Sequence, residues 1–267
     1  MKHEQKAILV RYGEVWLKSD PVRRQFEQTL CSNIRSVFSP ATKVTVVPGR
    51  IWIYSDKVPN ELARIFGVVS YSPVMICGKN IDEITAAARQ ITAKWKSGTF
   101  AIRARRSDKS FAMTSKELEI ALAEQVNLPV DLSNPRHELT VEIRDRAYLF
   151  EQTIRGPGGL PLGTAGKVAA QLRDGEDLMA AWLIMKRGAL PIFIKPKPVL
   201  LKISQKWAIG RKLRMAKSLK EAAKFRAAAV VDTRGKRAKE GDFVVLNPLV
   251  GFSSEEKKQL LKTVKSV

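Results

Sequence analysis

A segment rich in glycine and proline divides the chain and sets the main constraint on its fold. The segment, GPGGLPLGTAG at 156–166, holds five glycines and two prolines in a chain of 267 residues. Both residue types interrupt helices and strands, so such a run is typical of a hinge-like connector between domains. We therefore expect separate cores on its two sides, and the length suffices for two or three small domains.

The part before this segment alternates short strands with helices. Apolar periodicity predicts strands at 7–12, 43–47, 50–54, 70–77, 99–105, 138–144 and 148–154. Helices are predicted at 21–38, 59–66, 81–95 and 114–125, the last opened by a capping-box pattern, Thr114-Ser-Lys-Glu117. The first five elements follow the order β-α-β-β-α, which is typical of a ferredoxin-like domain. The remaining elements form a second α/β unit.

The part after the segment also alternates strands with helices. Strands are predicted at 167–172, 190–194, 228–231 and 243–246, and helices at 177–187, 204–226 and 254–265. Strands that alternate with helices imply a parallel sheet. The fold class expected for the whole chain is therefore α/β, with an α+β N-terminal half.

The charge of the chain points to a polyanionic partner. There are 47 Lys and Arg against 26 Asp and Glu, which gives +21, and residues 155–267 carry +15 of it. Nucleic acid is the favoured partner, and an anionic membrane surface is the alternative. Apolar runs are too short for a membrane span, and the start lacks a signal-peptide core, so a cytoplasmic protein is expected. Two cysteines and two histidines exclude a disulfide scaffold and a four-cysteine zinc site.

Two clusters before the glycine-rich segment are candidates for contacts with RNA phosphates. The first follows the strand at 7–12 and consists of Arg11, Lys18, Arg23 and Arg24. The second lies around the strand at 99–105 and consists of Arg103, Arg105, Arg106, Lys109, Thr114 and Ser115. Cations beside the hydroxyls and amides of a helix N-terminus favour phosphate binding. An ordinary solvated face is the alternative for both clusters.

A third candidate surface is the outer face of the helix predicted at 204–226. On a helical wheel, one arc holds apolar residues and the opposite arc holds six cations: Lys206, Arg211, Arg214, Lys217, Lys220 and Lys224. This pattern predicts an amphipathic helix with a strongly cationic outer face. An RNA-backbone surface and a merely solvated face remain open for it.

The loop between the strand at 167–172 and the next helix has the geometry of a phosphate cradle. Such a cradle needs several glycines, so that backbone amides can close on the anion. The loop here, Arg173-Asp-Gly-Glu-Asp177, keeps one glycine, Gly175, and places three carboxylates where an anion would lie. The residues therefore argue against nucleotide binding at this loop.

Several motifs together resemble the tRNA 4-thiouridine synthetases, a family also linked to thiamine biosynthesis. The motifs are RYGEVWLKSD, VSYSP, FAIRARRSDKSFAMTS, VEIRD and GPGGLPLGTAGKV, with weaker similarity at VVLNPLVGFSSEE. The resemblance implies a ferredoxin-like domain at 1–60, a THUMP domain at 61–165 and a parallel α/β adenine-nucleotide α-hydrolase-like domain at 166–267. It further implies that the first two domains hold the acceptor region of tRNA. The third domain would activate a uridine with ATP, and a cysteine would deliver sulfur.

The sequence departs from this family where the chemistry would occur. The pyrophosphate loop of the family reads Ser-Gly-Gly-x-Asp-Ser, and its counterpart here is shorter, with Arg173, Gly175 and Asp177 as degenerate nucleotide contacts. The best match to the family's sulfur-carrying cysteine is Gly210, and neither Cys31 nor Cys77 lies in the third domain. No catalytic residue is therefore assigned.

These departures predict a tRNA-binding protein without thiolation activity of its own and without a cofactor. The alternative is a divergent tRNA 4-thiouridine sulfurtransferase that still binds ATP and receives sulfur or a catalytic loop from a partner protein. A regulatory subunit of an intact synthetase is a third interpretation. The resemblance also suggests a homodimer, because the family often dimerises.

Overall fold

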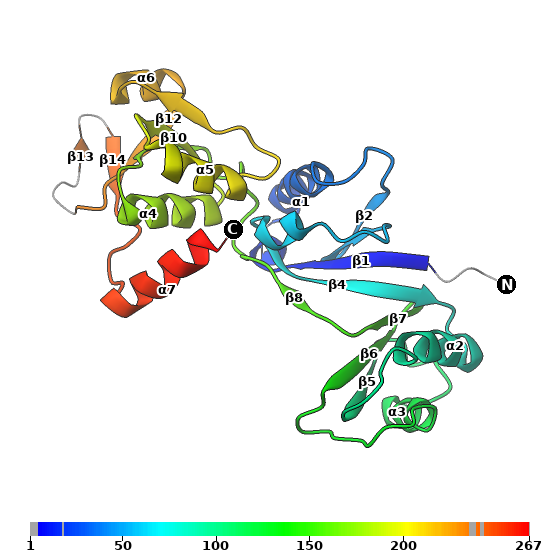
Figure 1. Ribbon diagram of the computed structural model, residues 1–267. Coiled ribbons are helices and arrows are strands. Elements are labelled where there is room, and N and C mark those ends of the chain that lie inside the picture. Colours follow the sequence, from blue (N-terminus) through cyan, green and yellow to red (C-terminus); the bar gives the residue numbers. More distant parts are fainter. Residues whose placement is uncertain (1–4, 18, 235–238, 241–242, 267) are drawn as a thin grey trace. The chain divides into compact units, whose positions relative to one another are not determined.

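The structure is a computed structural model that describes residues 5–17, 19–234, 239–240 and 243–266 (Figure 1). The chain divides into two compact units, and each is composed of several segments. The first unit consists of Met1–Val10, Lys43–Val58 and Tyr71–Ile154, and the second of Arg11–Thr42, Pro59–Ser70 and Arg155–Val267. The glycine-rich segment at 156–166 therefore belongs to the second unit.

The first sheet has eight strands in the order β2-β3-β1-β4-β7-β6-β5, with β8 paired to β4. In chain order the strands are β1 (Gln5–Tyr12), β2 (Val44–Val47), β3 (Arg50–Ile53), β4 (Val68–Cys77), β5 (Phe100–Arg106), β6 (His137–Ile143), β7 (Ala147–Phe150) and β8 (Ile154–Arg155). The helices of this part are η1 (Glu14–Leu17), α1 (Asp20–Arg35), η2 (Asn60–Arg64), α2 (Ile81–Thr92) and α3 (Ser115–Ala123). The predicted order β-α-β-β-α is confirmed, as is the second α/β unit.

Apolar periodicity explains how the second α/β unit packs. Ile84, Ala87, Ala88 and Ile91 of α2 are all buried in one core with residues of β5, β6 and β7, as their helical spacing predicts. The helix α3 adds Leu118 and Leu122 to the same core. Its predicted capping box is present, because Thr114 and Glu117 each bond to the other's backbone N–H.

The second sheet has six strands in the order β11-β10-β9-β12-β14-β13. Its elements are β9 (Lys167–Gln171), α4 (Gly175–Lys186), β10 (Leu190–Ile194), α5 (Pro198–Trp207), β11 (Arg214–Ala216), α6 (Leu219–Lys224), β12 (Ala227–Val231), β13 (Lys239–Glu240), β14 (Phe243–Leu246) and α7 (Ser254–Lys265). All pairings are parallel except β13 with β14, so the predicted parallel sheet is confirmed. Residues of α4, α5 and α7 pack in one core on the sheet, and α6 contributes to a separate core.

The prediction of one long helix at 204–226 is wrong. The helix α5 ends at Trp207, and Gly210 follows with a φ of 74°, a conformation that ends a helix and favours glycine. Residues Arg214–Ala216 then form β11 beside β10, and Ser218 caps the separate helix α6. The six cations predicted to share one helical face therefore lie on two helices, a strand and two loops.

The glycine-rich segment is packed, contrary to the prediction of a hinge-like connector. Leu160 and Leu162 are buried, and a Cβ added at Gly156 would lie 2.3 Å from the carbonyl oxygen of Val68. A Cβ added at Gly159 would lie 2.1 Å from the carbonyl oxygen of Lys186. At Gly156 and Gly159 the lack of a side chain thus allows backbone segments to approach closely.

Candidate nucleotide loop and nucleic-acid interface

The parallel sheet has a switch point between β9 and β12. From β9 the chain adds β10 and β11 on one side and later adds β12 on the other. In open α/β sheets, ligands bind in the crevice at the carboxyl ends of the strands where the order reverses. Two segments meet at this crevice: the loop from Arg173 to Asp177 after β9, and residues 232–234 after β12.

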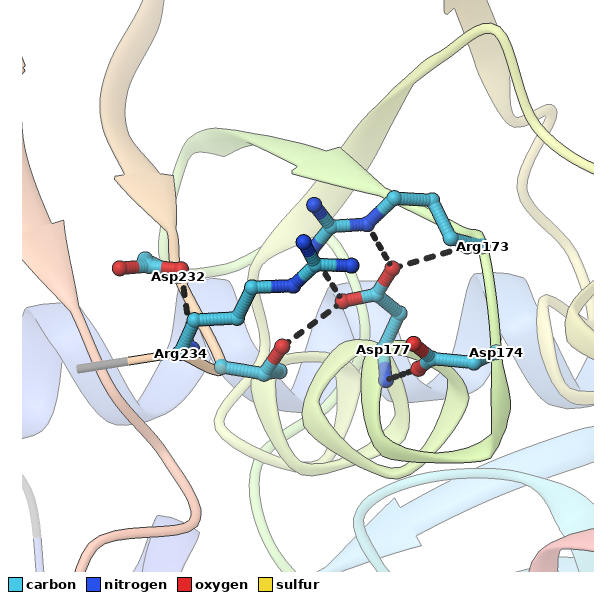
Figure 2. Close-up of polar contacts among 6 residues, drawn as sticks. Arg173, Asp174, Asp177, Asp232 and Arg234 are labelled. Atoms are coloured by element: carbon cyan, nitrogen blue, oxygen red, sulfur yellow. Dashed lines mark hydrogen bonds and ion pairs between the residues drawn. The ribbon is translucent and has the colours of Figure 1, made fainter. Parts of the chain in front are cut away.

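The crevice holds a buried carboxylate that is fully engaged by the chain itself. Asp177, 4% exposed, accepts hydrogen bonds from the backbone N–H of Arg173 at 2.8 Å and from its Nε and Nη2 at 2.7 and 2.9 Å (Figure 2). The hydroxyl of Thr233, which follows β12, donates to the same carboxylate at 2.9 Å. These bonds join the carboxyl ends of β9 and β12 through one aspartate.

The hydrogen bonds keep this carboxylate ionised. Burial alone would raise the pKa of Asp177, but the bonds from Arg173 and Thr233 outweigh it, and the pKa is lowered below its usual value. The same interaction raises the pKa of Arg173. The charges in the crevice therefore compensate one another within the protein.

The N-terminus of α4 is also occupied by the chain's own carboxylates. Asp174 caps the helix by accepting from the backbone N–H of Asp177 at 3.0 Å, and Glu176 pairs with Lys257 of α7 at 2.8 Å. Gly175 has helical geometry, with room for a Cβ at 3.4 Å from Leu261, so no close backbone approach requires glycine here. This donor set does not fit a triphosphate, because carboxylates occupy the helix N-terminus that would bind it.

The position that matches the family's sulfur-carrying cysteine has no space for a side chain. A Cβ added at Gly210 would lie 2.6 Å from the Cα of Asn33, a fully buried residue of α1. Both cysteines of the chain are buried, and burial raises the pKa of the Cys31 thiol to about 11. A thiol with so high a pKa carries little nucleophilic thiolate at neutral pH.

Part of the cation cluster predicted around β5 is used inside the protein. Arg106 donates to the backbone carbonyls of Phe111 and Met113 at 2.9 and 2.8 Å and so holds the loop before α3. Arg103 donates to the carbonyl of Leu132 and lies 3.5 Å from Glu138. These two arginines stabilise the fold, whether or not they also touch RNA.

The remaining residues of this cluster surround the start of α3. Arg105 and Lys109 are exposed, and Ser115 is the first residue of the helix. Thr114 caps the helix together with Glu117, whose pKa is lowered by hydrogen bonds from the backbone and side chain of Thr114. Because Glu117 already supplies a negative charge at this N-terminus, the attraction for a phosphate is weaker than the sequence predicts.

The first predicted cluster is only partly brought together. Arg11 is half-buried at the end of β1, and Arg23 pairs with Asp20 within α1 at 2.8 Å. Arg24 is exposed on the same helix. Lys18 lies outside the described residues. These positions remain predictions for RNA contact.

The six cations predicted on one helix have different surroundings. Arg211 donates to the carbonyl of Leu162 at 3.2 Å, and the Arg214 guanidinium lies 5.1 Å from the centre of the Phe225 ring. Three are exposed around α6: Lys217, Lys220 and Lys224. Lys206, on α5, lines a cavity together with three cations that no sequence pattern groups: Arg64, Arg155 and Lys186.

Two properties of the described residues bear on the predicted partners. Among the described residues, no group of three or more His, Cys, Asp or Glu side chains is arranged to hold a metal ion. Within the same residues, no helix combines the length and apolar character needed to cross a membrane.

Family models match most of the N-terminal half. The ThiI ferredoxin-like domain matches residues 7–72, and the THUMP domain matches residues 78–150. A probable tRNA sulfurtransferase of Methanothermobacter thermautotrophicus is 40% identical over 197 residues, which are 68% of this chain and 50% of that protein. Proteins of the same name from Methanocaldococcus jannaschii and Saccharolobus islandicus are each 36% identical, over 74% and 78% of this chain and 57% and 61% of their own lengths. The chain thus spans half to three fifths of these curated relatives.

Solved structures extend the similarity of fold to the whole chain. PH1313 from Pyrococcus horikoshii superposes with a TM-score of 0.80 at 27% identity, covering 97% of this chain and 99% of its own. A 4-thiouridine synthetase solved with RNA and ATP gives a TM-score of 0.79 at 24% identity, covering 98% and 85%. The likeness to both structures is one of fold. By its two matched domains and its curated relatives, the chain belongs to the ThiI family of THUMP-domain proteins.

Proposed function

We propose that the chain binds tRNA through its ferredoxin-like and THUMP domains. The observation that carries this proposal is the match to both domains, in order, over most of residues 7–150. The net charge of +21 supports a polyanionic partner. The relatives named as probable tRNA sulfurtransferases support tRNA as that polyanion.

We further infer that the α/β domain does not activate uridine with ATP. This rests on the crevice between β9 and β12, where Asp177 already accepts from Arg173 and Thr233. It also rests on Gly210, where a cysteine side chain would collide with Asn33.

A second candidate function is a divergent tRNA sulfurtransferase that receives sulfur from a partner protein. The names of the curated relatives favour this reading over the first. It requires the Arg173–Asp177 pair to open, so that the backbone amides at the start of α4 become available to a phosphate.

One preparation of the full chain separates the two candidates. It is incubated with unmodified tRNA, ATP and sulfide, and the digested tRNA is searched for 4-thiouridine by mass spectrometry. Calorimetry on the same preparation measures ATP binding and tRNA binding. We expect tRNA to bind, ATP not to bind and 4-thiouridine to be absent. Saturable ATP binding together with 4-thiouridine would instead establish the sulfurtransferase.

A further inference from the structure

The second unit contains a cavity of about 770 Å³ lined by cations from four elements. Its basic residues are Arg64 at the end of η2, Arg155 in β8, Lys186 in the last turn of α4 and Lys206 in α5. The other lining residues are Asn60, Ala63, Gly156, Pro157, Trp182, Trp207, Thr263 and Ser266. The cavity is lined by the C-terminal ends of α4, α5 and α7. The candidate nucleotide loop, Arg173 to Asp177, lies at the opposite, N-terminal end of α4.

Among the described residues of the lining there are four cations and no Asp or Glu side chain. A concave surface of one sign focuses its field and raises the local concentration of counter-ions. Arg64 has a carboxylate nearby, Glu61 at 3.6 Å, whose side chain is 47% exposed and therefore partly screened by solvent. Lys206 also has an interaction partner of its own. Lysines in the last turns of α4 and α5 also offset helix dipoles, but this does not explain Arg155, which lies in the strand β8.

The walls of the cavity are fixed by backbone hydrogen bonds of the glycine-rich segment. The N–H of Gly156 donates to Val69 at 2.9 Å, and the N–H of Leu160 donates to the carbonyl of Lys186 at 2.9 Å. At Gly159 a Cβ would collide with that same carbonyl. The segment therefore fixes the backbone next to Arg155 relative to the end of α4, so that bringing these two cations to one ligand requires side-chain but little backbone ordering.

The aromatic residues behind the cations favour phosphate over a base as the ligand. Trp182 and Trp207 are 4% and 5% exposed and pack edge to face at 5.4 Å, so neither ring offers a free face for stacking. Lys186 lies over the Trp182 ring with Nζ at 5.2 Å from its centre. The buried ring N–H of Trp182 has no acceptor among the described residues.

We propose that this cavity binds phosphate groups of the RNA backbone and so extends the RNA contact into the α/β domain. The inference rests on the proposed tRNA binding. Contacts would be electrostatic and independent of base sequence, because the lining offers cations and no exposed aromatic face. The RNA-contacting cations of the second unit would then be Arg64, Arg155, Lys186 and Lys206, rather than a continuous helical face.

The test compares the full chain with the double variant R155Q/K186Q. Equilibrium binding of labelled tRNA is measured between about 50 and 300 mM salt. We expect the variant to bind roughly tenfold more weakly at moderate salt. The slope of log K against log salt should fall by about one for each cation removed. Near-ultraviolet circular dichroism checks that the variants keep the native fold.

The matched control is K202Q/K258Q, which removes the same charge from exposed positions of α5 and α7 outside the cavity. Equal losses in the two double variants would reveal only a dependence on net charge and would overturn the cavity site. If the unmodified chain fails to bind tRNA, the proposed function itself is wrong. If it binds and R155Q/K186Q binds equally well, the cavity inference alone is wrong.

Titration with inorganic phosphate, monitored by tryptophan fluorescence, distinguishes a site for RNA phosphates from a site for a small phosphorylated ligand. Trp182 and Trp207 line the cavity and report on its occupation. A phosphate response that R155Q/K186Q abolishes, with unchanged tRNA affinity, would indicate a small phosphorylated ligand and would overturn the RNA assignment.

Discussion

Asp177, in the first turn of α4, determines whether this helix N-terminus is available to a ligand. Its carboxylate is nearly inaccessible and receives four hydrogen bonds, three of them from Arg173. A buried carboxylate so well satisfied stabilises the fold, and removing its charge leaves Arg173 without a partner. The residue that resembles the last aspartate of a pyrophosphate loop therefore has a structural role in this protein.

We predict that Asp177→Asn lowers the free energy of unfolding by about 1–3 kcal/mol at neutral pH. The pKa of Asp177 is lower in the folded protein than its ordinary value of 3.8, so its contribution is fully present above that value. The contribution is lost as pH falls through the lower folded pKa. Urea unfolding at several pH values should therefore show the gap between wild type and variant closing below about pH 4.

The exposed Asp56, in the first unit, provides the control for this experiment. Asp56→Asn should change stability by less than about 0.5 kcal/mol. A gap between wild type and Asp177→Asn that stays constant from pH 7 to pH 3 would show that the carboxylate is not held ionised by Arg173.

The hydrogen-bond partners of single residues could be predicted where the two residues lie close in sequence. The Thr114–Glu117 capping box depends on four consecutive residues, and the structure confirms it. The bond from Thr233 to Asp177 joins residues 56 positions apart and depends on β9 lying beside β12. No local pattern contains that information, so the sequence predicted carboxylates at this loop but not their partner Thr233.

At the scale of elements, the glycine-rich segment determines where its neighbours lie. Four of its glycines have positive φ: Gly158, Gly159, Gly163 and Gly166. They differ in the space around them. A Cβ at Gly159 would collide with the backbone of α4, whereas a Cβ at Gly166 would meet nothing within 4 Å. This pair separates the cost of a left-handed backbone from the cost of a lost packing contact.

We predict that Gly166→Ala lowers the free energy of unfolding by about 1–2 kcal/mol, because a residue with a Cβ is strained in the left-handed conformation of this position. Gly159→Ala should cost clearly more, because the backbone of Lys186 must also move. Thermal or urea unfolding of both variants measures the difference. Equal losses would mean that the segment does not pack on α4 as described and would weaken the case for a rigid cavity.

The error over 204–226 shows what helical periodicity cannot decide. Alanines and lysines there repeat at helical spacing, yet the local stop and start signals, Gly210 and Ser218, carry more weight. Placement of β11 also depends on pairing with β10, a contact between distant segments. The continuous cationic face predicted for this helix is therefore absent from residues 204–226, which the structure describes, and its six cations lie on several separate elements.

At the scale of the whole molecule, the order of elements was the most predictable property. Alternation of strands and helices predicted both the ferredoxin-like start and the parallel C-terminal sheet, and the family resemblance supplied the THUMP domain. The grouping of segments was not predictable, because α1 joins the C-terminal part in one unit through contacts such as Asn33 Nδ2 with the carbonyl of Leu162. The cationic cavity depends on the same grouping and therefore has no signature in the sequence.

The measurement that tests the central claim most directly is the affinity of the full chain for tRNA as a function of salt. A chain with a net charge of +21 that contacts several phosphates should bind tightly at low salt. Each phosphate contact should add about 0.7–0.9 to the slope of log K against log salt, so we expect a slope of about −3 or steeper. Affinity that stays flat between about 50 and 200 mM salt, or no binding at low salt, would contradict the account.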